Sequence, residues 1–315
     1  MTGKNVTEVL PPDSEGIARA VQALRAGDLV AVPTETVYGL AARADQAEAV
    51  ARIYAAKGRP DFNPLIVHVR DLAQAETLAV FDERSRDLAA RFWPGPLTLV
   101  LPLRTDAPIA TAVSAGLPTI AVRQPAHPVM RSILDEIGLP LAAPSANRSE
   151  HISPTRVDHV MTSLGGKCPL ILDGGPSESG LESTIVALRE GGGWSLLRPG
   201  PITLERLEAV LGPAQKAEFG TIEAPGQLAR HYSPGKPVRL NALEVAQDEF
   251  LIGFGSQSGD CNLSESGDLN EAAAGLYDCL HKAAASPKPG IAVAPIPGGE
   301  AGRAINDRLR RAAAP

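Results

Sequence analysis

The positions of apolar and polar residues predict a chain of alternating short strands and amphipathic helices over residues 14–211. Short apolar runs bounded by Gly, Pro or polar residues are typical of buried strands, and apolar residues three and four positions apart are typical of helices. Ile17, Val21 and Leu24, for example, follow the helical spacing. Strands are expected at residues 28–32, 65–69, 97–103, 119–123, 139–143, 170–172, 183–188 and 194–197. Helices are expected at residues 14–25, 46–56, 82–91, 127–137, 155–164 and 203–211.

The pattern changes at about residue 212. Residues 213–238 are rich in Pro and Gly, which predicts a linker. Beyond it a small α/β pattern follows, with strands expected at residues 250–254 and 290–294 and helices at residues 272–285 and 302–313. The expected organisation is therefore a main domain at residues 1–212 with a loose lead-in at 1–12, a linker or lid at 213–238, and a small C-terminal domain at 239–315.

Polar residues gather at the ends of the first two expected strands. Thr34, Glu35 and Thr36 follow one strand, and Gly39 is expected to turn the chain away. Ligands of open α/β sheets bind outside the carboxyl ends of strands. Lys57 and Arg59 lie in a Gly- and Pro-bounded loop, and two cations there suit an anionic ligand. A lone loop cation is more often solvated, and a lone strand His, such as His68, is more often structural.

Further strand ends carry cations and hydroxyls of the same kind. Together they are Lys57, Arg59, Arg123 and Arg198 with Thr36, Ser145, Ser153, Ser183 and Thr184. Phosphoryl or nucleotidyl transfer needs such positioning and charge stabilisation more than a covalent nucleophile. Asp173, Glu35 and Glu182 are candidate Mg²⁺ ligands, although carboxylates at loop ends more often cap helices or form ion pairs.

Composition narrows the function classes. The net charge of −6 and the aromatic content of 4% argue against a dedicated nucleic-acid binder. The three cysteines show no C-x-x-C spacing, so neither a zinc site nor a disulfide framework is expected. There is no P-loop, H-E-x-x-H or G-x-S-x-G motif. Without a signal-peptide core or an apolar run of membrane length, the chain is expected to be cytoplasmic and not to enter a membrane.

Six motifs in this order give the chain a recognisable resemblance. They are P-T-E-T-V-Y-G-L, K-G-R-P, N-P-L-I-V-H-V, W-P-G-P-L-T, A-P-S-A-N and E-S-T-I-V, and the resemblance that they carry covers about residues 14–205. This set resembles the YrdC-type family of L-threonylcarbamoyladenylate synthases, with Lys57-x-Arg59 and Ser145-x-Asn147 as the specific signature. The linker A-P-G-Q-L-A-R-H-Y-S-P and the tail resemble the longer, two-domain members, although Ala224 stands where a serine is common.

The resemblance implies a fold and a reaction. The fold is a twisted open α+β sheet of the YrdC type, followed by a small Rossmann-like α/β domain. The reaction joins L-threonine, bicarbonate or CO₂, and ATP into threonylcarbamoyl-AMP and pyrophosphate, with Mg²⁺ expected. A downstream tRNA threonylcarbamoyl transferase would then use the product, and direct tRNA binding by this chain would be weak or absent.

The resemblance also assigns roles to individual residues. Lys57 and Arg59 would be catalytic and would neutralise the triphosphate. L-Threonine would contact Thr36, His68, Arg123, Ala143 and Ser183. ATP would contact Arg59, Asn63, Thr119, Ser145, Asn147, Ser153, Arg198 and Tyr232. A guanidinium such as that of Arg123 suits the threonine carboxylate, and the labile carbamate requires a site that excludes water.

Two alternatives stay open on the sequence. A double-stranded RNA-binding module could use a basic concave surface, which the charge disfavours. A carbamoyltransferase that uses carbamoyl phosphate could share the domain, but such proteins carry zinc-finger and acylphosphatase-like regions that this sequence lacks.

Overall fold

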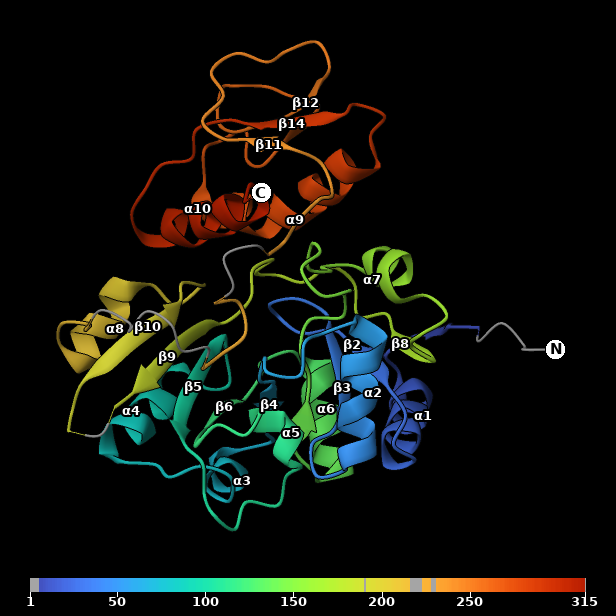
Figure 1. Cartoon of the computed structure of the whole chain (residues 1–315), viewed down its shortest axis with the longest axis vertical. Helices are drawn as coiled ribbons and strands as arrows, with labels where there is room; N and C mark the ends of the chain where they lie inside the picture. The colour runs from blue at the N-terminus through green and yellow to red at the C-terminus, as the bar shows by residue number, and fades with distance from the viewer. Residues whose placement is uncertain (1–5, 190, 216–222, 228–230, 315) are drawn as a thin grey trace.

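The computed structural model describes residues 6–189, 191–215, 223–227 and 231–314 (Figure 1). They form a large mixed sheet and a small parallel sheet, each with its own helices. The strands of the large sheet are β1 (Glu8–Leu10), β2 (Val30–Val32), β3 (Gly39–Arg43), β4 (Ile66–His68), β5 (Leu97–Pro102), β6 (Thr119–Arg123), β7 (Leu141–Ala142), β8 (Leu170–Leu172), β9 (Thr184–Leu188) and β10 (Trp194–Arg198). Its helices are α1 (Ser14–Arg25), α2 (Ala47–Lys57), α3 (Leu72–Glu76), α4 (Glu83–Phe92), α5 (Thr111–Ser114), α6 (Pro128–Ile137), α7 (Val157–Leu164) and α8 (Leu204–Leu211).

The large sheet has ten strands in the order β1-β8-β2-β3-β7-β4-β6-β5-β9-β10. Four neighbouring pairs are parallel (β1/β8, β2/β8, β4/β6 and β5/β9), and the other five are antiparallel. Successive side chains point to opposite faces of a strand. Val30 and Val32 accordingly pack with α1 and α6, whereas Ala31 packs into the main core with α2 and α4. The expected twisted α+β sheet is confirmed.

Two short segments differ from the expectation. Glu8–Leu10, expected to be part of a loose lead-in, forms β1 and pairs in parallel with β8. Gly39, expected to begin a turn, instead begins β3, which runs antiparallel to β2. A Cβ at Gly39 would lie 3.4 Å from the Cβ of Ala143, so this glycine permits close packing at the sheet. Tertiary pairing outweighs the weak local signal of these segments.

The C-terminal residues build a second sheet, which Figure 1 shows above the main domain. Its strands β11 (Val238–Arg239), β12 (Glu249–Gly253), β13 (Cys261–Asn262) and β14 (Gly290–Val293) are all parallel, in the order β11-β14-β12-β13. The helices α9 (Leu269–Ala285) and α10 (Glu300–Ala312) lie between this sheet and the main domain (Figure 1). The expected small Rossmann-like α/β fold is confirmed.

The C-terminal domain contains one disulfide, which the spacing of the cysteines did not predict. Cys261 in β13 and Cys279 in α9 form a disulfide, whereas Cys168 is a buried free thiol. The two bonded residues are 18 positions apart, and their Cα atoms lie 5.9 Å from each other. The packing of α9 against the strand makes this pair, so short-range cysteine spacing could not predict it.

Candidate active site

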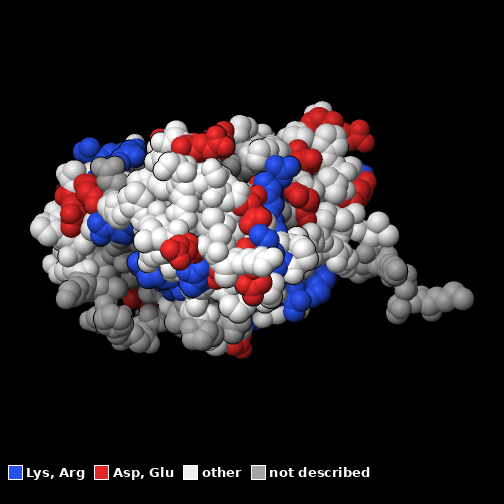
Figure 2. Space-filling model, turned by 90° about the horizontal axis from the view of Figure 1, so that it is seen from above, with Lys and Arg blue, Asp and Glu red and all other residues white. Residues whose placement is uncertain are grey.

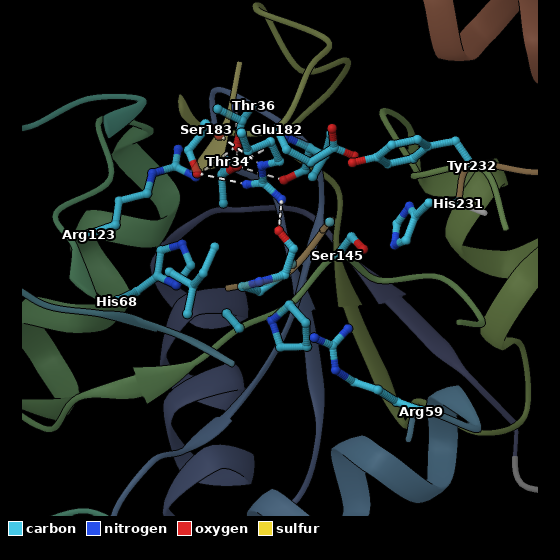
Figure 3. Close-up of a pocket in the computed structure, with 18 residues that line it drawn as sticks. Thr34, Thr36, Arg59, His68, Arg123, Ser145, Glu182, Ser183, His231 and Tyr232 are labelled. Atoms are coloured by element: carbon cyan, nitrogen blue, oxygen red, sulfur yellow. Dashed lines mark hydrogen bonds between the residues drawn. The ribbon is translucent and has the colours of Figure 1, made fainter. Parts of the chain in front are cut away.

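A cavity lies over one face of the large sheet, beneath the linker. Its lining includes polar side chains from the loop after β2, from β4, β6 and β10, and from the segments 143–145 and 182–183. Figure 3 shows Arg123 and His68 on one side of this cavity and Tyr232 and His231 on the opposite side. Of the residues predicted for the site, Thr36, Arg59, His68, Arg123, Ala143, Ser145, Ser183, Arg198 and Tyr232 line it.

The directions of the strands differ from the expected arrangement, and they place His68 and Arg123 side by side. β3 and β7 separate β2 from β4, and the successive antiparallel pairings make β2 and β4 run in opposite directions. The two carboxyl ends therefore do not share one edge of the sheet, contrary to the expectation from open α/β sheets. His68 and Arg123 are paired in the parallel register of β4 and β6, and with Ile66 they line the cavity.

The guanidinium of Arg123 organises one side of the cavity. It lies 2.7 Å from Glu35 Oε1, donates to Thr36 Oγ1 at 2.9 Å and to the Gly95 carbonyl at 3.2 Å. Burial opposes ionisation of Glu35, but the Arg123 charge still holds the pKa of this carboxyl below its ordinary value. A guanidinium has five N–H donors, so two remain for a carboxylate ligand.

The turn before Thr36 is fixed by a side chain. Thr34 Oγ1 accepts hydrogen bonds from the backbone N–H groups of Thr36 and Val37 and donates to the Val37 carbonyl. Such local bonds are typical of Thr in turns. They hold the Thr36 hydroxyl toward Arg123.

His68 provides a neutral imidazole. Burial, with the Arg123 charge adding to it, lowers the pKa of His68 to about 3. Its Nδ1 atom is buried and has no hydrogen-bond partner among the described residues. A neutral imidazole with a free nitrogen can donate to or accept from a small polar ligand in the cavity.

A second arginine, Arg198 at the end of β10, is hydrogen-bonded to Ser183, the residue before β9. Arg198 donates from Nη2 to Ser183 Oγ and from Nε to the Ser183 carbonyl, both at 3.0 Å. Ser183 Oγ also shares a hydrogen bond of 2.7 Å with Thr98 Oγ1. Burial lowers the pKa of Arg198, yet a guanidinium remains charged at neutral pH. The Ser183 hydroxyl is thereby held in a fixed orientation at the cavity wall.

The loop after α2 presents Arg59. Gly58 ends the helix with φ of 59°, a left-handed conformation that suits glycine. Arg59 then donates to Asn63 Oδ1 at 2.6 Å and to the Pro64 carbonyl at 2.8 Å. Burial lowers the pKa of Arg59 to about 10, so it is a cation at neutral pH. Asn63 thus orients Arg59 and does not line the cavity.

Lys57 lies behind the cavity wall. Its ammonium donates to the carbonyls of Ser145 at 2.5 Å and Asn147 at 2.6 Å. Burial, together with the nearby Arg59, lowers the pKa of Lys57 well below its ordinary value. Asn147 in turn donates to the carbonyls of Arg148 and His151. In this conformation Lys57 and Asn147 shape the loop that carries Ser145, and neither lines the cavity.

The linker closes the cavity on the side of Tyr232. This tyrosine is fully buried at φ of 62°, and its hydroxyl has no hydrogen-bond partner among the described residues. Gly226 lies against it: a Cβ there would come within 3.3 Å of the Tyr232 hydroxyl and 3.0 Å of Arg198 Cδ. Gly226 also has φ of 86°, so both its conformation and its contacts favour glycine.

Two further predicted residues, besides Lys57, Asn63 and Asn147, lie away from the cavity lining. Thr119 is at the start of β6, at the opposite end of the strand from Arg123. Ser153 donates to Glu182 Oε1 at 2.5 Å. Glu182, expected above only as a candidate Mg²⁺ ligand, lines the cavity. Thr34, Pro225, Gly226 and His231 also line it, and none of them was assigned to threonine or ATP from the sequence. Their proximity in sequence to Thr36, Ser183 and Tyr232 was the available signal.

The candidate Mg²⁺ ligands have protein partners. Glu35 pairs with Arg123, Glu182 with Arg308, and Asp173 accepts from the Gly175 N–H. Among the described residues there is no group of three His, Cys, Asp or Glu side chains suited to a metal ion. These residues therefore do not form a cage for a protein-held Mg²⁺.

Comparison with known proteins agrees with this architecture. Residues 22–200 match the family of Sua5, YciO and YrdC, described as "Telomere recombination", which defines the class of the main domain. Residues 202–314 match the family described as "Threonylcarbamoyl-AMP synthase, C-terminal domain". The chain thus joins a Sua5/YciO/YrdC domain to the C-terminal domain of a particular enzyme family.

Individual relatives are similar over most of the chain. Threonylcarbamoyl-AMP synthase of Bacillus subtilis is 41% identical and covers 98% of this chain and 96% of its own length. That of Pyrococcus abyssi is 47% identical over 68% of this chain and 64% of its own length. The crystal structure of P. abyssi Sua5 complexed with L-threonine superposes with a TM-score of 0.88 at 36% identity, covering 98% of this chain and 97% of that one. The chain belongs to the threonylcarbamoyl-AMP synthase family, in its two-domain Sua5 form.

Proposed function

We propose that this protein synthesises threonylcarbamoyl-AMP and pyrophosphate from L-threonine, bicarbonate or CO₂, and ATP. It is a nucleotidyltransferase of the Sua5 type, as its similarity to the family over nearly the whole chain supports. The residue assignments are supported by one observation: a single cavity is lined by residues assigned to threonine and by residues assigned to ATP. Thr36, His68, Arg123, Ala143 and Ser183 gather near one another, and Arg59, Ser145, Arg198 and Tyr232 complete the lining.

The side with Arg123 is proposed to bind threonine. The two remaining N–H donors of Arg123 meet the carboxylate, and bidentate binding of this kind is strong and directional. Thr36, neutral His68 and Ser183 face the amine and hydroxyl, with the backbone at Ala143 nearby. Neutral His68 adds no positive charge beside the amine, which must be deprotonated before it can form the carbamate.

The side with Arg59 and Arg198 is proposed to bind ATP. An oxygen of the threonine carbamate attacks the α-phosphorus, and the bond from that phosphorus to the bridging oxygen breaks to release pyrophosphate. Negative charge grows on the departing phosphates, and buried cations aimed at such charge stabilise the transition state. Ser145, Asn63, Asn147, Ser153 and Thr119 are retained as proposed ATP residues, and Lys57 as a proposed catalytic residue.

The linker at residues 213–238 is proposed to be a lid. The described part of it brings Pro225, Gly226, His231 and Tyr232 to the cavity, while Arg230 lies outside the described residues. The cavity has a volume of about 40 Å³, whereas ligand pockets usually measure about 300–1,000 Å³. Admission of ATP and threonine therefore requires the linker to move outward, and its return would shield the labile carbamate from water.

The domain boundaries 1–212, 213–238 and 239–315 stay part of this proposal, supported by the two separate sheets. Mg²⁺ is proposed to arrive on the triphosphate, because Mg²⁺ usually binds through substrate phosphates with few protein ligands. Within the described residues no helix is both long and apolar enough to cross a bilayer. We propose a cytoplasmic location and delivery of the product to a tRNA threonylcarbamoyl transferase.

The face of the molecule shown in Figure 2 does not favour the RNA-binding alternative. On the face shown in Figure 2, Lys and Arg side chains are interspersed with Asp and Glu rather than gathered in one large basic area. The net charge of the chain is −6. A phosphate-binding surface is instead expected to be continuous and basic.

Pyrophosphate release tests the function. We expect ATP to be converted to pyrophosphate only when threonine and bicarbonate are both present, and the product to carry the mass of threonylcarbamoyl-AMP. Replacing threonine by alanine, which lacks the hydroxyl, controls for general adenylation. Equal release with threonine or bicarbonate omitted would contradict the proposal.

A further inference from the structure

The carboxylate of Glu182 accepts hydrogen bonds from side chains of both domains. It lies directly before Ser183, is 6% exposed and lines the cavity. Ser153 of the main domain donates to Oε1 at 2.5 Å. Tyr277 of α9 donates to the same carboxylate at 2.8 Å, and Arg308 of α10 donates from Nε to Oε2 at 2.8 Å. Two of its three donors therefore come from the C-terminal domain.

These contacts hold Glu182 as an anion. Burial by itself would raise its pKa, but the charges of Arg308 and Arg198 and the Ser153 hydroxyl bring the pKa down to about 2. An ionised carboxylate only accepts hydrogen bonds, so its orientation follows its donors. The orientation of Ser153, and of the backbone leading to Ser183, follows from the same contacts.

Arg308 also reaches the linker. Its side chain is fully buried, and its guanidinium carbon lies 5.3 Å from the centre of the Tyr232 ring. The Tyr277 ring lies 5.6 Å from the same tyrosine. A cation over an aromatic face is attracted to it, more strongly in a buried place. The same two residues thus contact both Glu182 in the main domain and Tyr232 in the lid.

We propose that Arg308 and Tyr277 are positioning residues of the active site: they align Ser153 and Ser183 through Glu182, and they hold Tyr232 in the closed lid. The C-terminal domain thereby sets the affinity for ATP without touching it. The inference rests on the proposed synthase function, because its residues act on the groups assigned to that reaction.

Tyr277→Phe is the most direct test, because it removes a single hydroxyl and keeps the ring. We expect the KM for ATP to rise about tenfold, the loss typical of a hydrogen bond to a charged group, at nearly unchanged melting temperature. Arg308→Met should raise the KM for ATP further, and Arg308→Lys should give a KM between those of Arg308→Met and the wild type. Arg303→Met is the matched control: Arg303 is also on α10 and pairs with Glu205 of the main domain, but on the surface at 3.1 Å.

The route through Glu182 is tested by combining changes. If Arg308 acts through this carboxylate, Glu182→Gln together with Arg308→Met should cost little more in KM for ATP than either change alone. Fully additive effects would overturn that route. An unchanged KM in folded Tyr277→Phe and Arg308→Lys, with wild-type synthase activity intact, would overturn the inference while leaving the proposed function standing. Wild-type protein without threonine-dependent activity would contradict the function itself.

Discussion

Glu35 Oε1 lies 2.7 Å from Arg123 Nη2, and both side chains are buried. The ion pair restrains the guanidinium of Arg123, a residue that also lines the cavity. Any replacement of Arg123 therefore has to keep a charge beside Glu35, because an unpaired buried carboxylate costs about 3–5 kcal/mol of stability.

Arg123→Lys is expected to weaken threonine binding selectively. Lysine keeps the positive charge but cannot bind a carboxylate bidentately. The KM for threonine should rise about tenfold or more, with a much smaller change for ATP, in steady-state pyrophosphate assays. Arg70→Lys, which alters an exposed arginine paired with Asp71, is the control. A selective loss of ATP affinity would instead place Arg123 at the phosphates.

Arg59→Ala is expected to lower activity, whereas Lys57→Met is expected to lower both activity and stability. Loss of the Arg59 charge should lower kcat/KM about 10²–10³-fold. Lys57→Met leaves the buried carbonyls of Ser145 and Asn147 without their donor, which costs about 1–3 kcal/mol for each unsatisfied group. It should therefore lower the melting temperature as well as the activity. Loss of activity at an unchanged melting temperature would show that Lys57 acts on the triphosphate directly.

Gly226→Ala is expected to raise the KM for ATP. The added Cβ would lie 3.0 Å from Arg198 Cδ and 3.3 Å from the Tyr232 hydroxyl, so both side chains have to shift. Gly235→Ala is a matched control, because Gly235 has a similar φ of 75° but open space around its Cβ position. Both changes carry the same backbone strain, so equal effects on the KM would contradict a role of the Gly226 contacts.

The lowered pKa of buried His68 leads us to expect that stability depends on pH. Its pKa is about 3 in the folded protein and 6.5 as an ordinary histidine, so the unfolded chain binds more protons between these values. Stability from this residue is present above pH 6.5 and is lost as the pH falls toward 3, by up to about 1.4 kcal/mol per pH unit. Urea unfolding of His68→Gln should give a flatter pH profile than wild type. His151→Gln, at an exposed position, should leave the slope unchanged, and equal slopes in all three proteins would contradict the assignment.

The local features of the site were predictable from sequence. Apolar runs marked the strands before Thr36 and through Arg123, because buried strands need continuous apolar residues. Gly58 and Pro60 marked the loop that carries Arg59. These signals lie within a few residues of the groups that they position.

The long-range features were not predictable in the same way. Arg308 is 126 positions from Glu182, and Tyr277 is 95 positions from it. Both helices also carry charged residues on the surface, so nothing local separates Arg308 from Arg303. The backbone pairing that makes a strand of Glu8–Leu10 likewise depends on β8, far along the chain.

The volume of the cavity has a consequence for measured affinities. About 40 Å³ is available in this form, and if the linker is the lid proposed above, ATP and threonine enter only when it lies outward. The measured dissociation constant is then the intrinsic constant divided by the fraction of open molecules, and an open fraction of about one tenth weakens binding tenfold. A change that only favours the outward linker, and leaves Ser153, Ser183 and the contacts of Tyr232 as they are, would make equilibrium binding of ATP tighter and turnover slower, because the open molecules that admit the nucleotide also expose the carbamate to water. Tyr277→Phe and Arg308→Met differ from such a change, because they also release Glu182, which positions groups proposed to contact the ligands.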